Sequence, residues 1–150
     1  MTDTIVAAFV AVDVEGVLRA WLRQQPILAD VVEQRIYFAA PAKLPTDADG
    51  KLLQHLTLHL VNNPQLASVV PGTNALVQFD CYGRTKEEAA AVSVALLTLA
   101  LNVRGRVRIG DGVICGDWRV VRHQDFTDTS SNRARYSLDI EFPILAGMAG

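Results

Sequence analysis

Apolar residues near the start of the chain recur with the period of a helix. Asp13 precedes them, and its carboxylate can accept hydrogen bonds from the free N–H groups of a first helical turn. Spacings of three and four residues then separate Val14, Val17, Leu18, Trp21 and Leu22. Such spacings place the side chains on one face of a helix, so the pattern predicts an amphipathic helix that begins near Asp13.

A second, shorter helix is expected directly afterwards. Pro26 fits a first helical turn, because the N–H that proline lacks is one that a helix start leaves unpaired. The helix should cover Ile27 to Glu33, and the chain should become extended from Arg35 to Phe38. Pro, Lys, Thr, Asp and Gly then cluster from Pro41 to Gly50, which predicts a long exposed loop.

Two segments in the middle of the chain show the alternation of half-buried strands. From Leu56 to Val61, leucines occupy every second position, and from Val77 to Tyr82 apolar residues alternate with polar ones. Thr85 and Glu88 then have the spacing of a capping box, which predicts a helix that runs to about Asn102.

Short strands and a hairpin are expected in the last third. From Val107 to Val121, β-branched residues are broken by glycines, which indicates short strands joined by a turn and interrupted by a bulge. Apolar and polar residues alternate strictly from Arg133 to Phe142. This last strand should pair with Trp118 to His123 as an antiparallel hairpin with a polar tip.

The predicted elements follow the order α-α-β-β-α-β-β in a single domain of residues 1–150. Each helix and each sheet must bury one apolar side. The order therefore predicts an α+β fold, in which helices pack on one face of a mostly antiparallel, curved sheet.

Composition narrows the possible partners. The net charge of -2 and the pI of about 5.9 give no overall attraction to nucleic acid or to anionic membranes. The longest nearly apolar stretch, Ala89 to Leu101, is shorter than the about twenty residues that span a bilayer, so no transmembrane segment is expected, and with no basic excess no membrane partner is expected either. Cys81 and Cys115 lie on predicted strands and are expected to be reduced and buried.

The helix that begins at Thr85 has an unusually apolar circumference. Between Ala89 and Leu101 its only polar residues are Ser93 and Thr98, which lie about 140° apart around the axis and form no polar stripe. The uncovered flank is expected to meet a second copy of the chain, although helix one or the loop of residues 41–51 could cover it instead. The candidates for this subunit interface are Leu96, Leu97 and Leu101.

Charged residues mark a second group of candidates. Arginines alternate after the long helix and again at the start of the last strand, and acidic residues flank the tip of the hairpin. They could contact a partner protein or DNA phosphates, or they could be solvated; the two acids could also hold a divalent ion. The candidates are Arg104, Arg106, Arg133, Arg135, Asp125 and Asp128.

No catalytic, cofactor-binding or metal site is predicted. His55 and His59 lie on a predicted strand, where about 13 Å separates residues i and i+4, too far for one ion. The glycines around Asp111 join two strands and do not open a helix, so a turn is favoured over a phosphate cradle. A small enzyme or ligand-binding domain that uses His123, Cys115 and Asp117 stays open as an alternative.

The chain resembles the tail-terminator, or tail-completion, proteins of long-tailed bacteriophages. The resemblance covers nearly the whole chain. It rests on the first helix, on Gln34-Arg35-Ile36-Tyr37 before a Pro-containing loop, on the segment from Val77 to Ala89 that enters a helix, and on Tyr136 to Phe142.

The resemblance implies a role in assembly without a catalytic residue or a cofactor. Proteins of this family form hexameric rings that cap the tail tube, stop its polymerisation and present a surface to head-completion proteins. It therefore implies a virion tail protein, assembled in the host cytoplasm, that contacts copies of itself, the tube protein, a head-completion or connector protein, and DNA passing through the ring. A head-tail connector or a tail-tube subunit is the alternative within the same biology.

Overall fold

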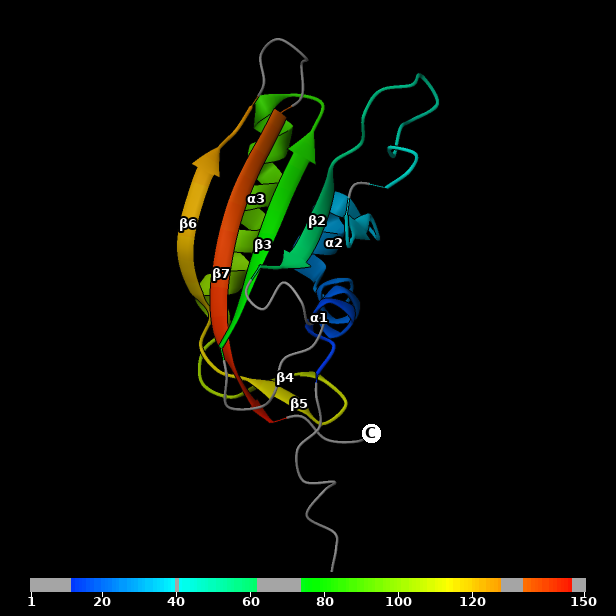
Figure 1. Cartoon of the computed structure of the whole chain (residues 1–150). Coiled ribbons are helices and arrows are strands. Elements are labelled where there is room, and N and C mark those ends of the chain that lie inside the picture. The colour runs from blue at the N-terminus through cyan, green and yellow to red at the C-terminus, as the bar shows by residue number, and fades with distance from the viewer. Residues whose placement is uncertain (1–11, 40, 62–73, 128–133, 147–150) are drawn as a thin grey trace, which may run out of the picture.

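The computed structural model describes residues 12–39, 41–61, 74–127 and 134–146 (Figure 1). The described part of the chain contains three helices and seven strands. In order these are α1 (Val14–Leu22), α2 (Pro26–Val32), β1 (Ile36–Tyr37), β2 (His55–Leu60), β3 (Asn74–Gly83), α3 (Lys86–Asn102), β4 (Val107–Gly110), β5 (Val113–Cys115), β6 (Arg119–Asp125) and β7 (Ala134–Ala146).

The strands form one sheet in the order β1-β2-β3-β7-β5-β4, and β6 also pairs with β7. Every pairing is antiparallel except that of the two-residue strand β1 with β2, which is parallel. The α+β prediction with a mostly antiparallel sheet is confirmed. The short strands and turn predicted from Val107 are confirmed as β4 and β5, and the predicted antiparallel hairpin is confirmed as β6 and β7. The long strand β7 pairs with β6 along one part and with β5 along another.

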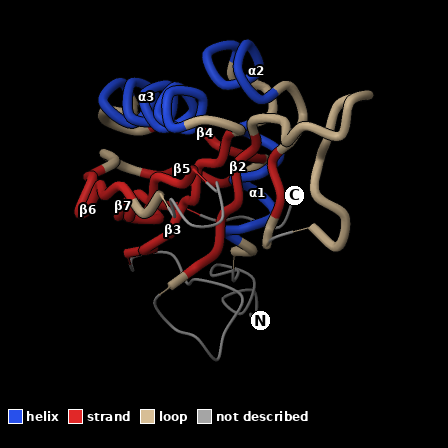
Figure 2. Tube along the Cα trace, turned by 90° about the horizontal axis from the view of Figure 1, so that it is seen from above, coloured by secondary structure: helices blue, strands red, loops and turns tan. Residues whose placement is uncertain are grey.

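The helices α2 and α3 lie together over one face of the sheet (Figure 2). Helix α3 packs on β3, β6 and β7, whereas α1 packs at the end of the sheet against β1, β2 and β4. The carboxylate of Asp13 caps α1 by accepting from the N–H of Gly16 at 3.2 Å, and Glu15 accepts from the N–H of Leu60 at 2.8 Å. These bonds begin the helix at the predicted residue and attach it to the end of β2.

Aromatic side chains fill the centre of the core. Trp118, which immediately precedes β6, is 1% exposed. Its ring stacks on Phe142 at 5.1 Å and lies 5.6 Å from Trp21 of α1 and 6.5 Å from Phe79 of β3. One residue thus joins helix α1 to the two central strands of the sheet.

The start of α3 matches the capping prediction. The hydroxyl of Thr85 accepts from the N–H of Glu88 at 3.2 Å. Strand β3 ends immediately before this turn at Gly83, where an added Cβ would lie 2.5 Å from the backbone nitrogen of Ala89. Glycine is needed here because the strand end and the first helical turn approach each other so closely.

The segment between β1 and β2 forms an arm that projects from the body of the molecule (Figure 1). The arm is defined here as residues 41–53. At its tip, Asp47 accepts from the backbone N–H groups of Asp49 and Lys51, each at 2.9 Å, and Thr46 forms an antiparallel bridge with Leu52. The predicted loop of residues 41–50 is therefore held in a defined shape by its own hydrogen bonds.

No helix among the described residues is long and apolar enough to cross a membrane.

Candidate interaction surfaces

An apolar flank lies along α3 and the adjoining edge strand β6. It consists of Val94, Leu97 and Leu101 on α3 and Val120 on β6. The exposed fractions are 60% for Leu101 and 57% for Val94, the highest among the exposed large hydrophobic side chains of the described residues. The two most exposed of these side chains therefore lie on one helix, beside an edge strand that α3 contacts.

The three leucines predicted for a subunit interface differ in their surroundings. Leu101 is on the open flank and Leu97 is half-buried beside it. Leu96 is fully buried in the core beneath α3 and cannot present its side chain to a neighbouring copy, which corrects its place in the prediction. Leu96 and Val92 lie four residues apart, so they share one side of α3, and both are buried on the side that packs on the sheet.

The polar residues of α3 do not make the flank hydrophilic. The hydroxyl of Thr98 donates to the carbonyl of Val94 at 2.7 Å, and the amide of Asn102 donates to the carbonyl of Thr98 at 2.7 Å. Ser93 is buried and donates to the carbonyl of Ala90 at 2.9 Å. Because these groups are bonded to the helix itself, the flank offers mainly methyl groups to a partner.

Helix α2 packs beside α3 and leaves the flank open. Neither α1 nor the loop of residues 41–51 covers the flank, since the side chains of Val94 and Leu101 remain more than half exposed.

The flank ends in a groove of about 460 Å³ between the last turns of α3 and the beginning of β6. Arg104 stands at its rim, exposed, and donates to the carbonyl of Trp118 at 2.8 Å. Asp117 accepts from the N–H of Gly105 on the same rim. The groove is lined by Leu97, Ala100, Leu101, Arg104, Asp117, Trp118, Arg119 and Val120.

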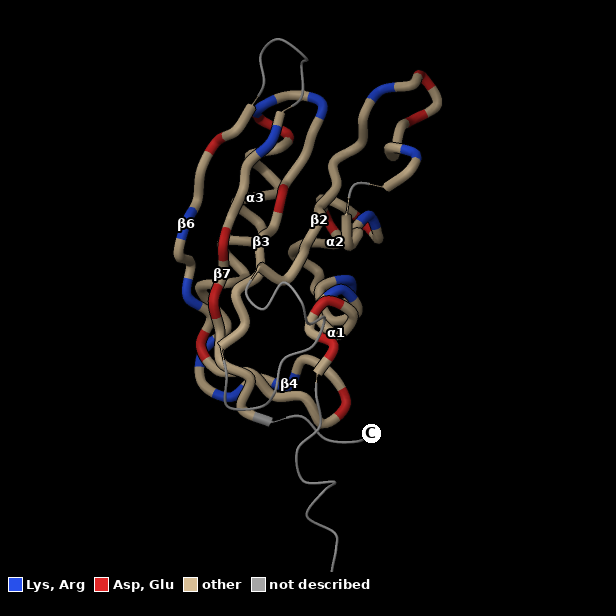
Figure 3. The backbone as a smooth tube through the Cα atoms, in the orientation of Figure 1, with Lys and Arg blue, Asp and Glu red and all other residues tan. Residues whose placement is uncertain are grey.

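The sheet face opposite α3 is polar. On β6 and β7, Arg122 donates to both carboxylate oxygens of Asp139, at 2.8 and 3.1 Å, and to the hydroxyl of Ser137 at 3.0 Å. Arg119 pairs with Glu141 at 2.7 Å, and Figure 3 shows the basic residues of β6 beside the acidic residues of β7. No sequence pattern predicts this network, because a bulge between Val120 and Arg122 sets the register.

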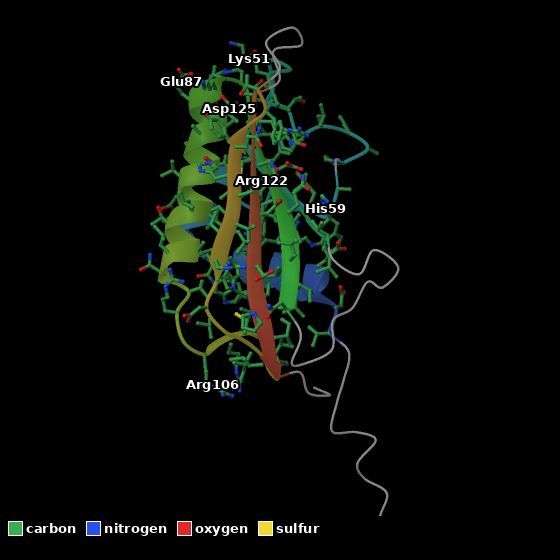
Figure 4. All side chains as sticks on the ribbon, turned by 60° about the vertical axis from the view of Figure 1, so that its left-hand side comes forward. Lys51, His59, Glu87, Arg106, Arg122 and Asp125 are labelled. Carbon is green, nitrogen blue, oxygen red and sulfur yellow. The ribbon has the colours of Figure 1, made fainter. Side chains whose placement is uncertain are left out.

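Two of the predicted charged residues lie near the far end of the same hairpin. Asp125, labelled in Figure 4, pairs with Lys86 of α3 at 3.1 Å. The guanidinium of Arg135 lies 5.0 Å from the ring centre of Phe126. The nearby Thr127 side chain, the N–H of Thr127 at 2.8 Å and Lys86 hold the pKa of Asp125 at about 2. Asp125 is therefore charged at any physiological pH and already has a cationic partner.

The remaining charged candidates are less constrained. Arg106 is exposed beside the turn at Gly105 (Figure 4), and it forms no hydrogen bond or ion pair with the described residues. With Arg104 it forms a basic corner at one end of the molecule. Asp128 and Arg133 lie outside the described residues.

The three residues of the alternative catalytic site are not brought together. His123 pairs with Leu138 of β7 and Cys115 pairs with Ile144, so six residues of β7, about 20 Å, separate them along the sheet. The indole N–H of Trp118 donates to the sulfur of Cys115 at 3.4 Å, and burial raises the pKa of that thiol. No group of three or more His, Cys, Asp or Glu suited to a metal ion occurs among the described residues.

The chain matches no protein-family model and no curated protein. Among solved structures it is similar to a chain of the virion of a native gene transfer agent particle. The TM-score is 0.55 at 15% identity, and the match covers 91% of this chain and 96% of that chain. At this identity the likeness shows the fold, which extends over almost the full length of both chains.

Proposed function

We propose that the chain is a tail terminator of a phage-like particle, which forms a ring on the end of the tail tube, stops its polymerisation and provides the surface for head joining. The observation that carries this proposal is the fold, which is that of a virion-particle chain over 91% of this chain. The resemblance in sequence to tail terminators supplies the specific role.

The open apolar flank supports self-assembly. In a lone protomer Val94 and Leu101 face water, and burying such side chains against a neighbour is favourable by about 25 cal/mol for each Å² removed from water. When each subunit contacts the next through two unlike surfaces, every subunit is rotated by the same angle relative to its neighbour. The assembly closes into a ring when a whole number of these rotations makes a full turn. We propose a hexamer as the closed form.

The partners of the ring are the tail-tube protein on one side and a head-completion or connector protein on the other. The basic corner formed by Arg104 and Arg106 supports contact with polyanions or with acidic surfaces, including DNA that passes through the ring. The place of action is the virion tail, with assembly in the host cytoplasm.

Deletion of the gene in a host that produces the particles tests the role. Electron microscopy of the released particles should show tails of uncontrolled length without attached heads, because nothing would stop the tube or receive the head. Tails of normal length joined to heads would contradict the proposal.

Native mass spectrometry of the purified protein separates the related roles. A closed hexamer supports a terminator, whereas a tail-tube subunit polymerises without limit. A monomer at every concentration would contradict the ring.

A further inference from the structure

The arm is a preformed projection with its own internal order. Its base is fixed by Gln54, whose carbonyl accepts from Arg35 at 2.7 Å and whose amide donates to the carbonyl of Glu88 in α3 at 2.9 Å. Its tip is held by the bonds of Asp47 to Asp49 and Lys51. An arm with a fixed base and an internally bonded tip loses little conformational freedom when it binds, which favours its use as a docking element.

Apolar side chains of the arm are partly exposed. Leu44, Leu52 and Leu53 are half-buried, and Ala48 at the tip is exposed. Ordered backbone with part of its apolar surface in water is typical of a segment that packs against a partner.

The arm and the apolar flank lie at opposite lateral edges of the molecule. The arm joins β1 to β2 at one edge of the sheet, and the flank includes β6 at the other (Figures 1 and 2). One chain can therefore hold a neighbour at each side at the same time. A contact between two unlike surfaces of identical chains is of the head-to-tail kind that builds rings.

Both surfaces carry charges that can pair across a contact. The tip of the arm carries the carboxylates of Asp47 and Asp49, and the arm also carries two lysines. The rim of the groove carries the exposed guanidinium groups of Arg104 and Arg119, the second already in an ion pair, together with the carboxylate of Asp117. Charges so placed help to set the orientation of the docked arm more than they add affinity.

We infer that the apolar flank of α3 and β6 receives the arm of a second copy of the chain. The leucines of the arm cover Val94, Leu101 and Val120, and the carboxylates of the tip lie at the guanidinium groups of the groove. This inference rests on the proposed function in that it supplies the subunit contact of the ring.

Cysteine cross-linking between two variants tests the contact. Ala48→Cys places a thiol at the tip of the arm, and Thr98→Cys places one within the flank; both side chains are exposed. With a short bismaleimide, the mixture of the two variants should give a covalent dimer, whereas each variant alone should give none. The double variant should give a ladder of covalent oligomers, because each subunit then links to both neighbours.

Two controls sharpen the test. Asp30→Cys, on the exposed side of α2, should not cross-link to Ala48→Cys. Adding Leu101→Asp to Thr98→Cys should abolish the mixed dimer, and a thermal unfolding curve of that variant shows whether it is folded. Dimers from Thr98→Cys alone would show flank against flank and would overturn the inference, as would a mixture that gives no dimer.

The tail-length experiment is independent of this contact. Cross-linked rings together with tails of normal length after gene deletion would leave the arm contact standing and remove the terminator role. Native hexamers that give no mixed cross-link would remove the arm contact and leave the terminator role.

Discussion

Arg122 and Asp139 lie opposite each other on β6 and β7 and are joined by two hydrogen bonds of 2.8 and 3.1 Å. The side chains are 32% and 19% exposed, so water screens this pair less than a pair on the open surface. The pair raises the pKa of Arg122 and joins the two strands immediately beyond the bulge.

Removal of this guanidinium should destabilise the fold more than removal of its neighbour. Arg122→Ala is expected to lower the free energy of unfolding by about 1–2 kcal/mol, because Asp139 and Ser137 lose their donor. Arg119→Ala is the matched control, since Arg119 is 71% exposed and makes one bond to Glu141; it should cost less than about 0.5 kcal/mol. Urea unfolding of both variants measures the difference, and equal losses would contradict the account.

The close approach at Gly83 makes a second prediction. Gly83→Ala should lower the free energy of unfolding by more than about 2 kcal/mol, because its Cβ would lie 2.5 Å from the nitrogen of Ala89 and the start of α3 would have to move. Gly50→Ala is the control: Gly50 has a φ of 77° but no atom near its missing Cβ, so it should cost only about 1 kcal/mol. Thermal unfolding of the two variants ranks them, and the reverse order would show that crowding is not the cause.

Much of the fold could be predicted because its local signals agree with its tertiary contacts. The cap at Thr85, the alternation through Leu138 and Ile140, and the apolar spacing of α1 all match the burial in the structure. The extended stretch predicted from Arg35 to Phe38 contains β1, but no periodicity could show that this two-residue strand pairs in parallel with β2. The short strands predicted from Val107 are present, but their pairing with β7 depends on the length of β7, which is a tertiary property.

The candidate surfaces were harder to predict for a physical reason. A helix that is apolar on every side has no sequence signal for the side that faces the sheet, so Leu96, Leu97 and Leu101 could not be distinguished before the packing was known. The Arg122 network was missed for a related reason, since a bulge changes which residues face each other across two strands.

The pKa of Asp125 leads to a prediction about acid conditions. Its folded value of about 2 is below its ordinary value of 3.8, so the contribution of this carboxylate to stability is complete above about pH 4 and is lost as the pH falls through 2. Carbon-detected NMR titration should give a midpoint near 2 for Asp125. Lys86→Ala should raise that midpoint toward the ordinary value, because it removes the ion pair at 3.1 Å, and an unchanged midpoint would show that Lys86 does not help to lower the pKa.

Both cysteines should be unreactive in the folded protein. Burial raises the pKa of Cys81 and of Cys115, and only the thiolate attacks an alkylating reagent. Intact mass after treatment with N-ethylmaleimide should show no added label without denaturant and two labels in urea. Labelling of the native protein would show that one of the two strands opens. In that case the cross-linking variants would have to be made in a chain whose two native cysteines are replaced by serine.

Leu96 and Leu101 separate folding from assembly on a single helix. Leu96→Ala should lower the free energy of unfolding by about 2–5 kcal/mol, because a fully buried side chain leaves a cavity. Leu101→Lys should change it by less than about 0.5 kcal/mol, since the side chain is 60% exposed, but it should abolish self-association by placing a charge within the apolar flank. Sedimentation velocity and urea unfolding of the two variants measure both properties. If Leu101→Lys assembles as the unaltered chain does, the flank is not a subunit contact, and the exposed leucine is part of the free surface.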